Sequence, residues 1–154
     1  MDPVRPAPER SVVDLLRETC RELVDELDAS TAVASRVIGD LLLELVVHTR
    51  AQRPLQLGHE YLISDFPLTV EVVEQLEPRR VSRFDPDADQ REVALLEQFG
   101  FDSLLMLPLS TDGKAWALLE IYHEGGRAFT EEDEARARPL AERVSSDLAR
   151  LTRR

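Results

Sequence analysis

Two apolar segments joined by a short turn constrain the fold of this chain more than any other feature of its sequence. Residues 103–109 read SLLMLPL, residues 115–123 read AWALLEIYH, and the sequence Thr-Asp-Gly-Lys lies between them. An Asp-Gly pair between two strand-like runs is typical of a tight hairpin, because both turn residues need a positive φ angle. We therefore expect two adjacent antiparallel strands joined at Asp112–Gly113.

Helical periodicity marks both ends of the chain. Near the start, apolar residues recur every three or four positions, which indicates one face of an amphipathic helix capped by Ser11. Near the end, residues 130–133 (TEED) match a capping box that opens a helix running to about Leu151. The first apolar stripe consists of Val12, Leu16, Cys20, Leu23 and Leu27.

Strand-like patterns fill much of the chain between these helices. Short β-branched or apolar runs, bounded by polar and turn-forming residues, are typical of the strands of a sheet. These runs lie at residues 31–38, 41–49, 61–63 and 79–84. A turn at Gly39–Asp40 is expected to join the first two into a hairpin. Because the strands outnumber the crossover helices that a parallel sheet needs, the expected fold class is α+β.

Two short helices and a tail complete the expected organisation. Asp65 is expected to cap a helix with Pro67 in its first turn, a position that suits a proline. Asp89 is expected to cap a second helix, which ends at Gly100. Residues 1–10 contain three prolines among charged residues, so we expect a mobile tail there. Residues 11–154 then form a single domain.

Charge and cysteine content disfavour several classes of function. The net charge of −11 argues against binding to nucleic acids or anionic membranes, because such binding needs clustered cations. The single cysteine, Cys20, permits neither an intrachain disulfide nor a cysteine-based zinc site. With no signal segment and no membrane-spanning apolar stretch, we expect a cytoplasmic protein. Eighteen arginines and one lysine indicate a bacterium with a GC-rich genome.

The second half of the chain carries an ordered set of motifs. Residues 101–122 contain an apolar strand ending in Pro-Leu, a turn with glycine and a second apolar strand, and residues 128–133 read AFTEED. This order resembles the GAF family of sensory domains, whose second strand is Gly-Val-Leu-like and whose last helix opens with Phe-Thr-x-x-Asp. Ala117 stands where the family usually has glycine. The resemblance covers about residues 11–151.

The resemblance implies a central antiparallel sheet of about six strands. The terminal helices cover one face, and a variable helical or loop segment on the other face closes over a ligand pocket. Residues 116–123 are similar to the Trp-Gly-Leu-x-x-Cys-His-His strand of tetrapyrrole-binding GAF domains. No Cys-His pair suited to bilin attachment is present, and the sequence identifies no cofactor.

Period-two alternation places Leu119, Ile121 and His123 on one face of that strand. The resemblance implies that this face lines the pocket, so the three residues are candidate ligand contacts. Phe66 and Phe84 flank the variable segment and are further candidates. The competing interpretation is an exposed histidine at a strand end and aromatic side chains that only fill the core.

The terminal helices are the expected means of association. In GAF domains such helices form a bundle between two subunits, so the resemblance implies a homodimer. One face of each helix covers the sheet, and a second face is expected to meet the partner. The expected interface residues are Val13, Val24, Ala137, Ala141, Val144 and Leu148.

Catalytic and metal-binding motifs are missing from the sequence. It contains no Gly-x-Ser-x-Gly, no phosphate-binding glycine loop and no histidine pair with metal-ligand spacing. We therefore expect a non-catalytic sensory or regulatory domain that binds a small molecule or partner and signals through its terminal helices. The alternative is a ligand-free GAF-like module that acts only in dimerisation or protein interaction.

Overall fold

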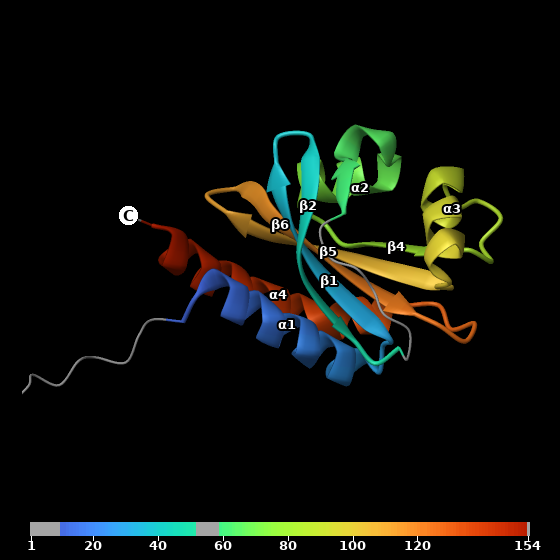
Figure 1. Cartoon of the computed structure of the whole chain (residues 1–154), viewed down its shortest axis with the longest axis horizontal. Helices are drawn as coiled ribbons and strands as arrows, with labels where there is room; N and C mark the ends of the chain where they lie inside the picture. The colour runs from blue at the N-terminus through green and yellow to red at the C-terminus, as the bar shows by residue number, and fades with distance from the viewer. Residues whose placement is uncertain (1–9, 52–58, 154) are drawn as a thin grey trace, which may run out of the picture.

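A six-stranded antiparallel sheet forms the centre of the protein (Figure 1). The computed structural model describes residues 10–51 and 59–153. The strand order is β3-β2-β1-β6-β5-β4, which confirms the α+β class and the antiparallel sheet. The strands are β1 (Thr31–Ile38), β2 (Leu41–Thr49), β3 (Glu60–Leu62), β4 (Arg79–Ser82), β5 (Ser103–Thr111) and β6 (Lys114–His123).

Helices cover both faces of the sheet. Figure 1 shows α1 (Val12–Leu27) and α4 (Glu131–Thr152) side by side along one face. The opposite face carries α2 (Pro67–Gln75) and α3 (Gln90–Phe99), and a short 3-10 helix, Ile63–Asp65, precedes α2. The two terminal helices, far apart in sequence, are therefore neighbours on the same side of the sheet.

The hairpin that joins β5 to β6 has the geometry expected from its sequence. Asp112 and Gly113 have φ angles of 52° and 75°, and Thr111 pairs with Lys114 across the turn. Two consecutive positive φ angles define the tight turn whose twist matches that of the flanking strands. This confirms that residues 103–111 and 114–123 are adjacent antiparallel strands.

Some predicted boundaries differ from the structure. Strand β4 ends at Ser82 instead of Phe84. The N-cap of α2 is Phe66, with no side-chain hydrogen bond, and not Asp65, because Pro67 itself occupies the start of the helix. The predicted tail at residues 1–10 lies, apart from Arg10, outside the described residues.

The sheet separates two apolar cores, and strand β6 contributes to both. Ala117, Leu119 and Ile121 pack in the core beneath α1 and α4. Leu118 and Tyr122 pack in the core beneath α2 and α3. Successive side chains of a strand point to opposite faces. A ligand or substitution that moves a β6 side chain in one core therefore acts on the same strand that packs against the helices of the other core.

The capping box that opens α4 gives a first testable prediction. Thr130 Oγ1 accepts a hydrogen bond from the Asp133 backbone N–H at 3.2 Å, and the Asp133 carboxylate accepts one from the Thr130 N–H at 2.9 Å. Thr130→Ala should lower the free energy of unfolding by about 1 kcal/mol. Urea denaturation measures this. Thr152→Ala, at the far end of α4, should change it by less than about 0.5 kcal/mol, and equal losses would contradict the capping role.

Candidate functional site

A small cavity lies on the face of the sheet that α3 covers. Strands β1, β2, β3 and β6 contribute to its walls, and so does α3. Its volume is about 30 Å³. That is room for one or two water molecules and far below the roughly 300–1,000 Å³ of pockets for drug-sized ligands. We call it the Glu120 cavity, after the acidic side chain in its wall.

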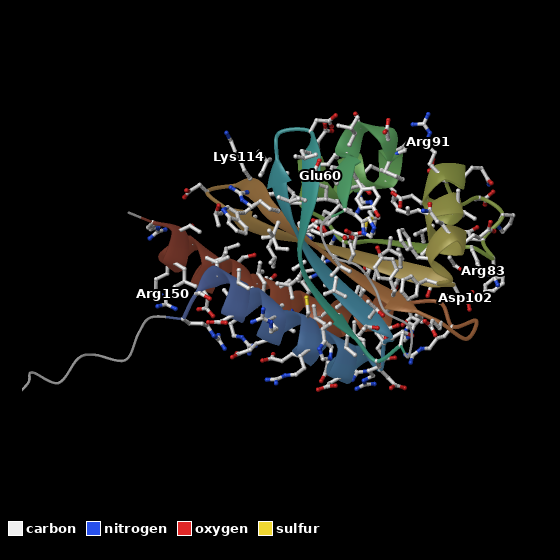
Figure 2. All side chains as sticks on the ribbon, viewed as in Figure 1. Glu60, Arg83, Arg91, Asp102, Lys114 and Arg150 are labelled. Carbon is white, nitrogen blue, oxygen red and sulfur yellow. The ribbon has the colours of Figure 1, made fainter. Side chains whose placement is uncertain are left out.

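Glu120 is a carboxyl group in the interior of the protein. The residue is 8% exposed, and its Oε2 atom accepts a hydrogen bond from the Tyr122 hydroxyl at 2.8 Å. Loss of hydration raises the pKa of Glu120 from 4.5 to about 8, and the nearby Glu92 and Glu44 carboxyls add to this rise. The group is therefore mostly neutral at pH 7. In Figure 2 the labelled side chains of Arg83, Arg91 and Lys114 lie, by contrast, at the periphery of the molecule.

Ser35 lies on the same face of the sheet as Glu120. Its neighbour on β1, Val33, pairs with Glu120, and Ser35 itself pairs with Leu118. The Ser35 residue is fully buried, and its hydroxyl lies beside the Glu120 carboxyl and partly counters the rise in its pKa. Yet Ser35 Oγ makes no well-formed hydrogen bond within the described ranges. A buried hydroxyl without a partner is uncommon, because losing water without replacement costs free energy.

Glu44 and His59 form a second polar contact in the cavity wall. Glu44 Oε1 lies 2.9 Å from His59 Nδ1 and accepts a hydrogen bond from the His59 backbone N–H at 3.2 Å. The Glu44 side chain is 11% exposed, whereas that of His59 is 39% exposed. Strand β2 holds the carboxylate in the wall, and the imidazole stands on its solvent side.

Aromatic rings make up much of the remaining wall. The cavity is lined by the rings of Tyr61, Phe99, Phe101 and Tyr122, as well as that of His59. Phe101 stacks on Tyr122 with ring centroids 4.5 Å apart, and His59 lies 5.7 Å from Phe99. Burial raises the pKa of the Tyr61 hydroxyl, and the Glu44 and Glu120 carboxyls raise it further. The tyrosine therefore stays neutral and keeps its proton as a donor.

A buried hydrogen bond fixes the helical cover over this face. Thr69 Oγ1, on α2, donates to Glu92 Oε1, on α3, at 2.8 Å, and both residues are buried. Burial raises the pKa of Glu92, and the Thr69 hydrogen bond partly opposes that rise. The pair ties the two helices together beside Met106 of β5.

The structure corrects the predicted orientation of strand β6. Leu119 and Ile121 are fully buried beneath α1 and α4 and do not line the Glu120 cavity. The prediction that their face lines the pocket is wrong, because both faces of β6 are apolar and alternation alone does not say which cover each receives. The cavity-facing residues are instead Glu120 and Tyr122.

His123 is buried at the end of β6, away from the Glu120 cavity. Its ring stacks on Phe129 with centroids 4.3 Å apart, and Nε2 makes no hydrogen bond to any described residue. Burial lowers the pKa of His123, and the positive charge of Arg127 lowers it further. His123 borders a surface hollow with Arg50 and Arg127. Because the residue is only 3% exposed, the alternative prediction of an exposed histidine at a strand end is also wrong.

The two phenylalanines predicted near the pocket occupy different environments. Phe66 is half-buried and makes an edge contact with Tyr61 at 6.0 Å, so it supports a wall residue without itself lining the cavity. Phe84 is 56% exposed, and the Arg83 guanidinium lies 4.4 Å from the centre of its ring. Arg83 also pairs with Asp102 at 2.6 Å, and Figure 2 shows the two side by side.

Five of the six predicted interface residues lie inside the single chain. Each is at most 6% exposed, because the stripe that carries them faces the sheet. These residues are Val24, Ala137, Ala141, Val144 and Leu148. Only Val13, at 41% exposure, lies on the surface. On the outer side the helices are joined by ion pairs, Arg136 with Glu26 and Arg143 with Glu22.

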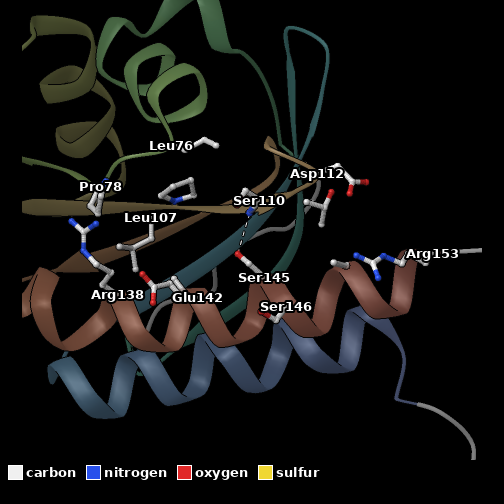
Figure 3. A pocket seen from close by; sticks show the side chains of 14 residues that line it. Leu76, Pro78, Leu107, Ser110, Asp112, Arg138, Glu142, Ser145, Ser146 and Arg153 are labelled. Atoms are coloured by element: carbon white, nitrogen blue, oxygen red, sulfur yellow. Dashed lines mark hydrogen bonds between the residues drawn. The ribbon is translucent and has the colours of Figure 1, made fainter.

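A larger groove of about 430 Å³ lies on the surface between α4 and β5 (Figure 3). Within it, the Ser110 backbone N–H donates to Ser145 Oγ at 3.0 Å. Arg138 lines the groove and pairs with Glu77 at 3.4 Å. Its polar groups are exposed or already paired, which distinguishes it from the Glu120 cavity, where carboxyl groups are buried.

A family model for the GAF domain matches residues 11–148. Because the match spans most of the sequence, the chain belongs to the GAF domain family. None of the curated proteins compared with the chain matches it.

Solved structures share the fold at low sequence identity. The phycocyanobilin-bound GAF domain from a cyanobacterial phytochrome is 18% identical, with a TM-score of 0.80 over 92% of this chain and 86% of that one. The blue-light absorbing form of the Thermosynechococcus elongatus PixJ GAF domain is 13% identical, with a TM-score of 0.78 over 91% and 86%. The chromophore-binding domain of a Stigmatella aurantiaca bacteriophytochrome is 19% identical, with a TM-score of 0.77 over 91% and 55%.

Within residues 10–51 and 59–153, no helix has the length and apolar character needed to cross a membrane. In the same ranges, no three His, Cys, Asp or Glu side chains gather in a way that could hold a metal ion.

Glu44 and Glu120 were not among the candidate residues expected from the sequence. Glu44 lies within LLLELVV and Glu120 within WALLEIY, each an isolated charge in an apolar strand. A charge at such a position is rarely buried without a specific partner. That pattern was the available signal for both residues.

Proposed function

We propose that this GAF domain is a non-catalytic sensory module that binds a small molecule at the Glu120 cavity. The observation that carries the proposal is the buried Glu120 carboxyl, which lies on the pocket face of the sheet beside a Ser35 hydroxyl with no well-formed hydrogen bond to a described residue. Buried polar groups with incomplete hydrogen bonding are costly to a fold, and strongly shifted pKa values cluster at functional sites. The family relationship supports a sensory role.

The proposed signal passes through strand β6 to the terminal helices. Glu120 and Tyr122 face the cavity, whereas Leu119 and Ile121, which alternate with them, pack beneath α1 and α4. A ligand that repositions β6 would thus change the packing of both helices, provided that it binds one arrangement better than the other. In this proposal the domain works in the cytoplasm.

A bound tetrapyrrole is not part of the proposal. The cyanobacterial phytochrome relative holds phycocyanobilin, but the cavity here has only about 30 Å³. Cys20 lies in the core beneath α1 and α4, on the other side of the sheet, and burial raises its pKa to about 12. A buried, protonated thiol on the far face is unsuited to covalent attachment.

The second candidate function is a ligand-free module for protein association. The small volume of the Glu120 cavity favours it, because a filled interior needs no ligand. A homodimer remains a proposal under either function. It needs a surface other than the five buried residues of the helical stripe, and light scattering at micromolar concentration measures the oligomeric state.

Filling the cavity distinguishes the two candidates. Val47 lines the cavity from β2, and Val47→Leu adds one methylene group to a space of about 30 Å³. Thermal unfolding should be measured with amines, carboxylic acids and uncharged alcohols at millimolar concentration. A compound at a hundred times its Kd stabilises by about 2.7 kcal/mol, or roughly 5–10 °C for a domain of this size.

For the sensory function we expect at least one class of compound to raise the Tm of the wild type but not of Val47→Leu. Val13→Leu, an equal change on the surface of α1, should keep the response. Hydrogen exchange of α1 and α4 amides should also slow when that compound binds. If no compound shifts the Tm and Val47→Leu is simply more stable than the wild type, the ligand-free module is the better description.

A further inference from the structure

We propose that the Glu120 cavity receives the ammonium group of a compact organic cation, held between Glu44 and Glu120 and surrounded by aromatic rings. This inference rests on the proposed sensory function and names the chemical class of its ligand. The rest of the ligand extends past the half-exposed His59 toward solvent. The inference is carried by the composition of the cavity wall, the burial of its carboxyl groups and a buried hydroxyl with no well-formed hydrogen bond to a described residue.

The aromatic wall favours a cation over an anion or a neutral group. Tyr61, Phe99, Phe101 and Tyr122 surround the cavity. The face of an aromatic ring attracts an alkylammonium ion electrostatically, and cages of such rings bind quaternary ammonium groups. Among the described residues, none that lines the cavity is a lysine or an arginine. An anion would meet the two acidic side chains Glu44 and Glu120 there.

The carboxyl groups supply the opposite charge and the hydrogen-bond acceptors. Glu44 is 11% exposed and Glu120 is buried, so both act where water screens charge weakly. Ser35 Oγ, next to Glu120, is fully buried and makes no well-formed hydrogen bond to a described residue. An ammonium group that contacts Glu120 would offer this hydroxyl a donor from which it can accept a hydrogen bond.

The size of the cavity limits the ligand. A space of about 30 Å³ holds one or two waters, and an ammonium group is similar in size to a water molecule. The cavity therefore suits the head of a small amine, with the carbon atoms nearer to Phe99 and His59. It does not suit a fused-ring ligand without rearrangement of α3.

Binding should be linked to the release of a proton from Glu120. The pKa of this group is raised to about 8, mainly by burial, and a cation favours its ionised form. Other titratable groups that face it are Glu44 on β2, Glu92 on α3 and Tyr122 on β6. His59 also belongs to this group of side chains, because its Nδ1 atom lies 2.9 Å from Glu44 Oε1.

Methylammonium and ethylammonium are suitable probes, because their ammonium groups fit the small space, donate hydrogen bonds and stay protonated up to about pH 9. Their affinity should rise about tenfold per unit between pH 6 and 7.5 and level off above pH 8. The neutral isostere of ethylammonium, ethanol, and acetate should bind at least about tenfold more weakly. Titration calorimetry or NMR of the wild-type chain measures these affinities, and ammonium chloride tests the bare ion.

Variants identify the residues responsible. Glu120→Gln and Glu44→Gln keep the shape of the side chain and should each weaken ethylammonium binding by about tenfold or more. Glu74→Gln, an exposed position on α2, should change it by less than about twofold. In Glu120→Gln the dependence on pH should largely disappear. If that variant does not fold, Glu44→Gln and the pH profile of the wild type still decide the question.

Each outcome supports or overturns the inference. Binding of both cations that depends on Glu44, Glu120 and pH supports it. Equal affinity for the neutral isostere, tighter binding of acetate, or equal binding of ammonium alone overturns the organic cation while leaving small-molecule sensing intact. If no compound of any class binds to the wild type, the inference and the sensory function both fail.

Discussion

Replacing Glu120 by glutamine should make the protein much more stable at alkaline pH while leaving it nearly unchanged near pH 5. The carboxyl has a pKa of about 8 in the folded protein and 4.5 as its ordinary value. Between these values the folded protein retains a proton that the unfolded chain has lost, so wild-type stability falls as pH rises. Each pKa unit corresponds to about 1.4 kcal/mol.

The advantage of Glu120→Gln over the wild type should therefore grow by on the order of 4 kcal/mol between pH 5 and pH 9. The glutamine oxygen can still accept the Tyr122 hydrogen bond, and Ser35 Oγ can accept from its amide. Urea denaturation at several pH values measures the effect. The contact with Arg83 lowers the pKa of Asp102, so this group is ionised throughout the range and does not add to the change in stability with pH. Parallel pH profiles for Glu120→Gln and the wild type would refute the buried-acid assignment; Glu74→Gln should give such a parallel profile.

Substitution of Leu148 by glutamate should unfold the domain and not merely separate two subunits. Leu148 is fully buried in the core between α4 and the sheet. Loss of a buried leucine side chain costs about 2–5 kcal/mol, which is the expected effect of Leu148→Ala. A glutamate adds the cost of an unpaired buried carboxyl, and the sum is comparable to the entire stability of a typical domain.

Circular dichroism and thermal unfolding test this expectation. Val13→Glu, on the exposed side of α1, is the matched control and should remain folded with a Tm within a few degrees of the wild type. If Leu148→Glu instead keeps a cooperative unfolding transition near the wild-type Tm, the residue does not belong to the monomer core. The original assignment to a subunit interface would then be restored.

Local sequence patterns were sufficient for most helices and strands. Ser11 caps α1, and Asp89 and Gly100 bound α3, because capping depends on side chains within one turn of the helix. The turn at Asp112–Gly113 was equally predictable, since it depends on which residues tolerate positive φ. These signals act over a few residues, so they can be read without knowledge of the rest of the chain.

The assignment of side chains to the two cores required the tertiary structure. Alternation showed that Leu119 and Ile121 share a face, but the apolar Leu118 lies on the opposite face, so either face was suitable for the pocket. The same uncertainty affected Leu148, whose helical stripe is apolar enough to meet either the sheet or a partner. The packing of α1 and α4 against the strands decides that this stripe contacts the sheet and not a partner.

The sequence by itself determined the elements, their antiparallel pairing at the Asp112–Gly113 turn and the family, because each depends on local chemistry and chain order. Only the tertiary structure brought Glu44, His59 and Glu120 to the wall of one cavity. Their meeting depends on strand order in the sheet, β3-β2-β1-β6, which places residues distant in sequence on one face. It also depends on which helices cover that face, since burial by α3 and its neighbours turns an ordinary glutamate into a neutral acid.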